Sequence, residues 1–197
     1  MLAAEVDWTV LDIRLASLDA RGETFVTGHV VEVIDTDGTP AQHTVYLDVA
    51  SDNPGTVTLE SLDGDRLAAW LYPADPALPA LAPSVYPGTA AVLLERLGID
   101  TTGLSVAVLA YRPGKRAVVR ATTTSRTLFL KIVRPDKVDA LRERHEAWAA
   151  NGIPVPRVAA WAPEGLLALD PLPGIESIGM LEHVAEFPNP TAAADVI

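Results

Sequence analysis

Cysteine is absent from the chain of 197 residues, which excludes disulfide bonds and catalysis by a thiolate. No run of about 18 apolar residues occurs, so the sequence predicts no membrane-spanning helix. The N-terminal segment Met1–Val10 contains acids and no basic residue, which argues against a secretory signal. These absences favour a cytoplasmic protein without a membrane partner.

Aromatic residues are also scarce: they make up 6% of the chain, although 49% of all residues are hydrophobic. Any core must therefore be packed mainly from Val, Leu and Ala. The length is sufficient for one large core or two small domains. The histidines do not have the spacing of metal ligands, so surface or helix positions account for them. They are His29, His43, His145 and His183.

Charge is distributed unevenly along the chain, whose formal net charge is -11. Residues 1–100 hold 16 acids and 4 bases, whereas residues 101–197 hold 10 acids and 11 bases. Ten bases and three acids lie between Arg112 and Arg144. This segment is either a solvated face or a local positive field for a polyanion such as a nucleoside triphosphate. Nucleic acid is disfavoured, because the acidic first half would repel a long phosphate backbone.

The first hundred residues predict a small, mostly β N-terminal unit. Alternating, β-branched segments between turn clusters indicate antiparallel strands over residues 23–33, 43–49, 56–61 and 67–71. The prolines of residues 72–83 exclude a helix or a central strand, which leaves an extended wrap onto a neighbouring surface or a linker. A short helix is expected over residues 87–98, with proline near its start and glycine at its end.

Residues 101–174 predict a second unit, an antiparallel five-stranded sheet with one inserted helix, so the fold class is α+β. The expected strands cover residues 104–111, 117–121, 128–133, 158–161 and 166–169. The helix is expected over residues 136–150, after the third strand, and Asn151-Gly152 ends it. The tail 175–197 is poorly patterned.

Lys131 is the most informative single residue, because it lies in the middle of an apolar strand. Alternation places it on the same side as Phe129 and Val133. An unpaired buried ammonium is costly, and nucleotide phosphates would compensate it. The alternative is an edge-strand lysine that prevents aggregation. The following helix offers Glu143, or else Glu146, as an ion-pair partner, although exposed helix charges explain both glutamates equally well.

Two further segments have a possible binding role. The turn Arg112–Arg116 either folds over phosphates or is a tight hairpin with solvated bases, since its single glycine gives few free backbone donors. Residues 167–174 form either a strand and hinge that would meet an adenine ring through the backbone, or an ordinary exit from a strand into a loop.

Taken together, residues 104–174 resemble the N-terminal part of the aminoglycoside phosphotransferase-like family, which includes choline kinases and maltokinases and has a protein-kinase-like fold. Residues 104–174 make up about a third of the chain, and the matching pieces within them are Leu128–Val133, the charged helix, Ile153–Val158 and Gly165–Gly174. Residues 1–100 are more loosely similar to the N-terminal region of bacterial members.

This resemblance implies a small, nucleotide-binding lobe with ATP as the cofactor. It implies that Lys131 anchors the phosphates and that Glu143 is its partner. It also implies a hinge formed by Ala168, Leu169, Asp170 and Pro171. Magnesium is expected for the full-length family.

The chain departs from the family after Gly174. The segment His-Gly-Asp-x-x-x-x-Asn that supplies the family's catalytic aspartate has no match, and His183 is followed by no aspartate at that spacing. No catalytic residue or metal ligand is therefore assigned. We expect an N-terminal fragment of an ATP-dependent small-molecule phosphotransferase that is inactive alone, binds ATP weakly and pairs with a separate catalytic lobe. The alternative is a non-catalytic binding or regulatory module built on the same small lobe.

Overall fold

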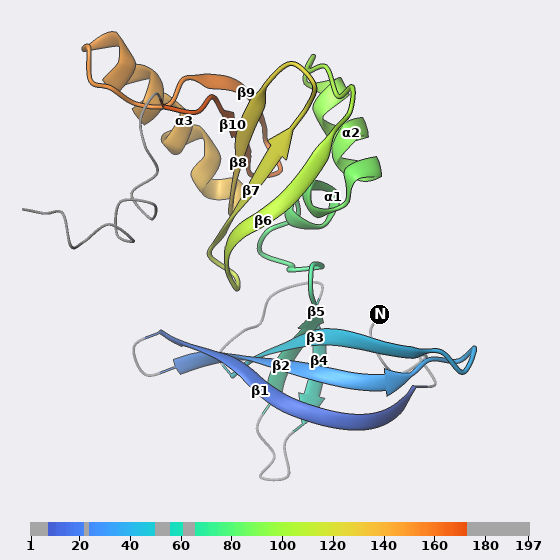
Figure 1. Cartoon of the computed structure of the whole chain (residues 1–197). Coiled ribbons are helices and arrows are strands. Elements are labelled where there is room, and N and C mark those ends of the chain that lie inside the picture. Colours follow the sequence, from blue (N-terminus) through green and yellow to red (C-terminus); the bar gives the residue numbers. More distant parts are fainter. Residues whose placement is uncertain (1–7, 22–23, 50–55, 61–65, 173–197) are drawn as a thin grey trace, which may run out of the picture.

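The computed structural model describes residues 8–21, 24–49, 56–60 and 66–172, and these form two antiparallel five-stranded sheets and three helices (Figure 1). The predicted α+β class is confirmed. Within these residues, no helix is both long enough and apolar enough to cross a bilayer. The predictions for His183 and for the tail 175–197 lie outside the described residues.

The first sheet has the strand order β1-β2-β3-β5-β4. Its strands are β1 (Thr9–Arg21), β2 (Thr24–Ile34), β3 (Pro40–Asp48), β4 (Val57–Glu60) and β5 (Arg66–Leu71). The last four correspond to the predicted strands, but β1 was not predicted. Its pairing with β2 shifts register between Val10 and Asp12 and again between Leu15 and Ser17. Each shift inserts a residue and breaks the alternation by which a strand is recognised.

One face of the first sheet packs toward the second sheet. Its buried side chains are Val26, Tyr46 and Trp70, against which Tyr111 of the second sheet packs. Gly28 allows this close packing: a Cβ atom there would lie 2.4 Å from Ser17 Oγ and 2.7 Å from Tyr46 Cε1. The two sheets therefore meet through an aromatic contact that a glycine makes room for.

Helices α1 (Leu81–Val85) and α2 (Pro87–Arg96) follow β5. The prediction that residues 72–83 exclude a helix is wrong at its end, because α1 includes Pro83. That proline is in the first turn, where a backbone N–H has no acceptor within the helix. The missing N–H of Pro83 therefore costs little. The segment packs on the second sheet, through Leu78 and Leu81 among others, although the sequence assigned it to the N-terminal unit.

The second sheet has the order β6-β7-β8-β10-β9. Its strands are β6 (Ser105–Arg112), β7 (Arg116–Thr122), β8 (Thr127–Val133), β9 (Val158–Ala162) and β10 (Leu166–Leu169). Helix α3 (Pro135–Ala150) lies between β8 and β9 in the chain. Five antiparallel strands with one helix after the third were predicted, and the structure has them.

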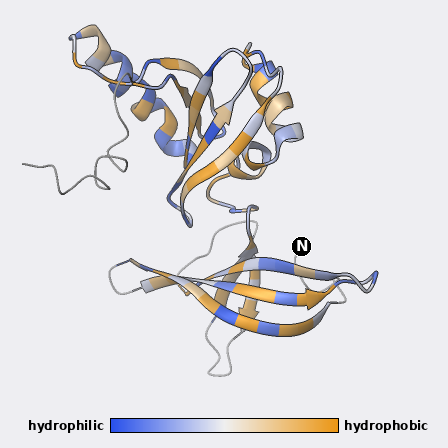
Figure 2. Ribbon diagram, viewed as in Figure 1, coloured by the Kyte–Doolittle hydropathy of each residue, from blue (hydrophilic) through white to orange (hydrophobic). Residues whose placement is uncertain are grey.

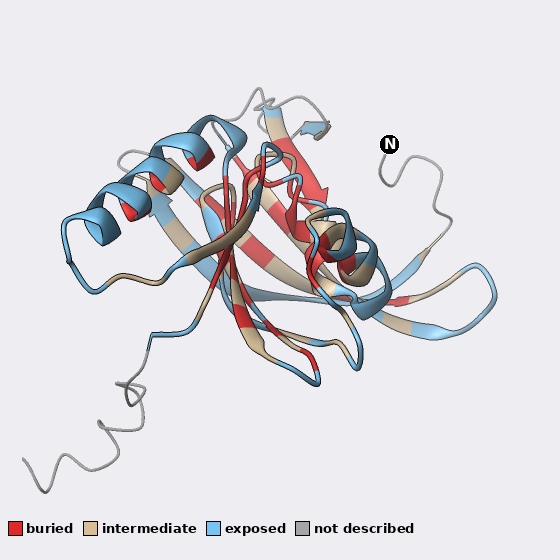
Figure 3. Cartoon of the chain, turned by 90° about the horizontal axis from the view of Figure 1, so that it is seen from above, coloured by how far each residue is buried: buried red, intermediate tan, exposed pale blue. Residues whose placement is uncertain are grey.

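Helices cover both faces of the second sheet. Ala117, Val119 and Leu130 point to the face that packs against α1 and α2. The opposite face packs against α3, where Val138 and Leu141 are buried against β8 and β10. Figure 3 shows this arrangement, with buried positions along the strands and an exposed outer side on α3. The second sheet thus lies at the centre of a helix–sheet–helix sandwich.

Candidate functional site

Lys131 lies on the face of β8 that points toward α3. It pairs with Val118 of β7 and with Leu167 of β10, so it is in the interior of the sheet rather than at an edge. The edge-strand explanation therefore does not apply to it. The predicted side of the strand is correct: Leu130 and Ile132, its neighbours in the chain, belong to the opposite core.

Lys131 lines a cavity of about 300 Å³. We call this cavity the lysine pocket, and define it by Lys115, Arg116, Lys131, Val133, Lys137, Ala140, Leu141 and Arg144. Five of these residues are bases and none is an acid. All three lysines of the chain are among them. A concentration of bases around one cavity is the environment that a compact polyanion requires.

Three structural elements bring these bases together. Lys115 and Arg116 come from the turn into β7, and Lys131 comes from β8. Lys137 and Arg144 lie seven residues apart on α3, so two helical turns place them on one stripe. The apolar floor of the pocket is continuous with the core that holds α3 against the sheet. The site is therefore fixed by rigid elements.

The surroundings of Lys131 disfavour its charge. Burial lowers the pKa of its ammonium group, and the nearby positive charges of Arg144 and Arg116 lower it further. Among the described residues, no carboxylate lies within ion-pair distance of Lys131 or of Arg116. A bound anion would remove this electrostatic cost.

Three of the other four bases of the pocket are partly compensated, and Arg116, within the described part of the chain, is not. Lys115 Nζ lies 3.3 Å from Asp19 Oδ2, and Lys137 Nζ lies 2.9 Å from Asp136 Oδ2. The guanidinium of Arg144 stacks over the Trp148 ring, 5.3 Å from its centroid. Positive charge in the lysine pocket is thus least compensated at its centre.

The structure does not bring Glu143 to Lys131. Glu143 Oε1 lies 3.7 Å from Arg142, and Glu146 accepts from Arg142 at 2.8 Å. The apolar stripe that includes Leu141 sets the rotation of α3. That rotation directs Arg144 toward the pocket and both glutamates outward. Lys131 therefore has Arg144, a residue of the same charge, nearby in place of the expected glutamate.

The predicted hinge residues complete a strand. Ala168 and Leu169 pair with strands on both sides, β8 and β9. The Asp170 N–H donates to the Arg157 carbonyl at 2.9 Å, and the Asp170 carboxylate accepts from Arg157 Nε at 2.7 Å. Pro171 has no N–H to donate. The contacts of Asp170 hold the end of β10, and recognition of a base by this segment stays a prediction.

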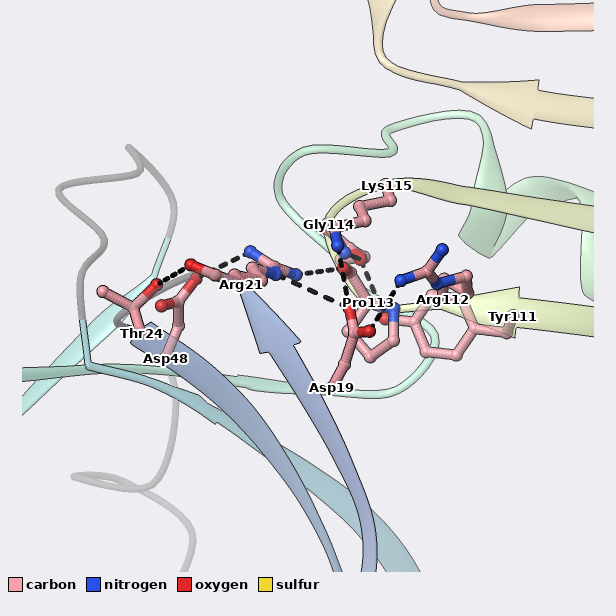
Figure 4. Close-up of polar contacts among 10 residues, drawn as sticks. Asp19, Arg21, Thr24, Asp48, Tyr111, Arg112, Pro113, Gly114 and Lys115 are labelled. Atoms are coloured by element: carbon pink, nitrogen blue, oxygen red, sulfur yellow. Dashed lines mark hydrogen bonds and ion pairs between the residues drawn. The ribbon is translucent and has the colours of Figure 1, made fainter.

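A polar network at the junction of the two sheets positions the turn that carries Lys115. Asp19 of β1 contacts Arg112 at 2.7 Å as well as Lys115, and these cations lower the pKa of Asp19. Arg21 binds Asp48 at 3.1 Å and donates to the Pro113 carbonyl. Figure 4 shows these contacts between β1 and the turn. The turn is thus tied to the first sheet.

Asp75 holds the same turn from the other side. It is only 3% exposed and accepts from the Gly114 N–H at 2.6 Å and from the Tyr111 hydroxyl at 2.8 Å. Burial, and then the charge of Asp75, raises the pKa of Tyr111, so Tyr111 stays a donor. The turn is a tight hairpin with partly exposed bases, as one alternative predicted, and the Gly114 N–H and the Arg112 side chain also hold it to the rest of the chain. Neither Asp19 nor Asp75 was predicted to contact the turn, because no local pattern links either residue to it.

Comparison with known proteins identifies no relative: no family model, no curated protein and no solved structure matches this chain. A function must therefore be inferred from the geometry of the lysine pocket. Among the described residues, no three His, Asp or Glu side chains gather in a way that could hold a metal ion.

Proposed function

We propose that the lysine pocket binds the phosphate groups of a nucleotide, and that the chain is the nucleotide-holding part of an ATP-dependent small-molecule phosphotransferase. The observation that carries the proposal is the cavity of about 300 Å³ lined by five bases and no acid, with Lys131 unpaired among the described residues. A cavity of this size suits a small ligand. Polyphosphate supplies the negative charge that the cavity lacks.

The strand plan supports the same function. A lysine in the middle of the third of five antiparallel strands, followed by one helix, is the plan that the family resemblance implies for a small lobe. Lys131 would then contact the phosphates as a compact cation, while Arg116 and Arg144 would neutralise their remaining charge. The expected role of Glu143 has no support in the contacts of α3.

Phosphoryl transfer would need groups that have no assignment in this chain. The catalytic aspartate and the magnesium ligands implied by the resemblance would have to come from a separate catalytic lobe. Magnesium, when bound there, would neutralise developing charge on the phosphates. The contribution of this chain is to bind and orient the nucleotide. We therefore expect the purified chain to phosphorylate no acceptor.

Isothermal titration calorimetry with ATP, tripolyphosphate and adenosine tests the proposal. We expect ATP and tripolyphosphate to bind with a Kd on the order of 1 mM, and adenosine not to bind detectably. Affinity should fall with salt and change little with magnesium. Lys131→Ala should weaken binding roughly tenfold, because it removes a charged donor.

The matched control is Arg120→Ala, which removes an exposed base from the same face of the sheet, outside the pocket. Its affinity for ATP should equal that of the unchanged chain. An equal loss in both variants would indicate a general charge effect and contradict the proposal. Micromolar affinity that requires magnesium would contradict the absence of an assigned metal site.

A non-catalytic docking module is the second candidate function. The observation that favours it is a set of exposed apolar side chains in the last turn of α3, just after α3 and after β10: Trp148, Ile153 and Leu172. A complex with a purified partner lobe that needs Ile153 but survives Lys131→Ala would support this function. Phosphorylation of an acceptor by the mixture, lost in Lys131→Ala, would support the first.

A further inference from the structure

The first sheet has one face that carries no formal charge in β1, β2, β3 and β5. Residues paired across an antiparallel sheet lie on the same face. One row across the strands contains Leu15, His29, Val45 and Leu71. The adjacent row contains Leu18, Thr27, Leu47 and Ala69. We call this side of the sheet the uncharged face.

The charged side chains of these strands are on the other face. That other face also holds Gly28 and Tyr46. In its rows Asp12 pairs with Glu32, and Arg14 donates to Glu32 at 2.6 Å. Figure 2 shows the resulting alternation of hydrophilic and hydrophobic residues along β1 and β2. Two bulges in β1 preserve this segregation, because each shifts the register where the sequence pattern would otherwise change side.

The uncharged face is open along β1, at Phe25 and at Leu59, whereas Val31, Val33 and Ala69 on the same face are buried. In Figure 1, the second sheet and the helices lie above the first sheet. The first sheet contacts the second through its other face, where Tyr46 packs against Tyr111. Large apolar side chains on the uncharged face are exposed; they are Val10, Ile13, Leu15, Leu18, Phe25 and Leu59. Among the described residues, Trp8 covers one corner by stacking on His43, with ring centroids 4.3 Å apart. Contiguous apolar patches of more than a few hundred Å² are rare on monomers and mark interaction sites.

We propose that the uncharged face binds the same face of a second copy of this chain, related by a twofold axis. Two copies each carry a net charge of -11, so most surfaces would bring like charges together. The uncharged face avoids this repulsion. A twofold axis also places one patch against itself, and a patch without charge is self-complementary in that arrangement.

The size of the face fits this occupant. At about 3.3 Å per residue and about 4.8 Å between strands, all five strands of the first sheet cover about 700 Å², which is an upper bound because Val31 and Val33 on this face are buried. Standard stable interfaces bury about 800 Å² per partner. Face-to-face packing of two sheets is also the usual way to bury apolar strands of this kind. The dimer would therefore be a sandwich of two first sheets, with the lysine pockets on the outside.

Sedimentation equilibrium of the full chain over a range of concentrations tests the proposal. We expect a monomer–dimer equilibrium with a Kd in the micromolar range. Leu15→Glu should raise that Kd at least about 100-fold, because it buries a carboxylate from each copy. Leu15 is 64% exposed in the single chain, so the variant should stay folded, which circular dichroism checks.

The matched control is Leu109→Glu, the same substitution at a residue of β6 that is 48% exposed and lies outside the uncharged face. Its Kd should be unchanged. If Leu15→Glu fails to fold, the milder Leu18→Ser should raise the Kd roughly tenfold. A chain that stays monomeric at millimolar concentration would overturn the proposal. So would a dimer that Leu15→Glu and Leu18→Ser leave intact, or association into larger species of no fixed size.

Discussion

The two sheets share one strand order and differ in what covers them. In each, the first three strands follow one another and the last two exchange places. The second sheet has helices on both faces, with cores on each side of β8. The first sheet has one covered face and one uncharged face that is open along β1. Strand order therefore does not decide whether the faces of a sheet are buried. The helices α1 and α2 before β6, and α3 between β8 and β9, decide it for the second sheet.

Truncation of equivalent apolar residues should give the largest contrast between the sheets. Leu130→Ala in β8, at 0% exposure, should cost about 3–5 kcal/mol, because it leaves a cavity between the sheet and α1. Ile13→Ala in β1, at 59% exposure, should change the free energy of unfolding of the monomer by about 0.5 kcal/mol or less. Urea unfolding at low protein concentration measures both. Equal losses would show that the first sheet is covered in solution even as a monomer.

Loss of Asp75 should have the next largest effect, because this residue joins the segment before α1 to the turn at Gly114. Asp75→Ala leaves the Tyr111 hydroxyl and the Gly114 N–H without their acceptor, which should cost about 2 kcal/mol. The turn that carries Lys115 should also shift, so tripolyphosphate should bind more weakly. Urea unfolding and calorimetry measure the two effects. Asp37→Ala, at an exposed turn carboxylate that accepts from the Thr39 N–H, is the control; it should cost less stability than Asp75→Ala and leave tripolyphosphate binding unchanged.

Lys131→Met should have the smallest effect and the opposite sign. The lowered pKa of Lys131 means that its charged form destabilises the folded chain below the folded pKa. Removing the charge should therefore raise the free energy of unfolding at neutral pH. Because half of the side chain is solvated, screening limits the gain to about 0.5 kcal/mol. Unfolding as a function of pH measures it.

This gain should decrease as the pH rises through the folded pKa of Lys131, where the unchanged chain loses the same charge. Tripolyphosphate at neutral pH should reverse the order of stability, since it binds only the unchanged chain well. A stability loss in Lys131→Met at all pH values would indicate that Lys131 packs as a structural residue and does not await an anion.

Alternation in the sequence was sufficient to predict most of both sheets. The segments that became β2, β7 and β8 alternate regularly, because each has one face toward a core. Strand β1 could not be found in this way, since its two bulges interrupt the period and its apolar residues have no core to face. Helix α1 was missed because proline excludes a helix only beyond the first turn.

The candidate site was predictable in part for a similar reason. Strand alternation gave the correct side for Lys131, which depends only on local geometry. The partner of Lys131 depends on the rotation of α3, and buried residues such as Leu141 fix that rotation through contacts with distant strands. Asp19 and Asp75 reach the turn across more than thirty intervening residues, and spacing alone cannot show such contacts.

All three primary amines on side chains of this protein border one cavity. Reagents that acylate or alkylate amines, whether used to attach a dye, to couple the chain to a sensor surface or to cross-link it, will therefore act on that cavity and nowhere else among the side chains. Burial and the nearby Arg144 and Arg116 lower the pKa of Lys131, which favours the unprotonated amine that such reagents attack. Immobilisation for binding studies should use an inserted cysteine, which the cysteine-free sequence makes unique.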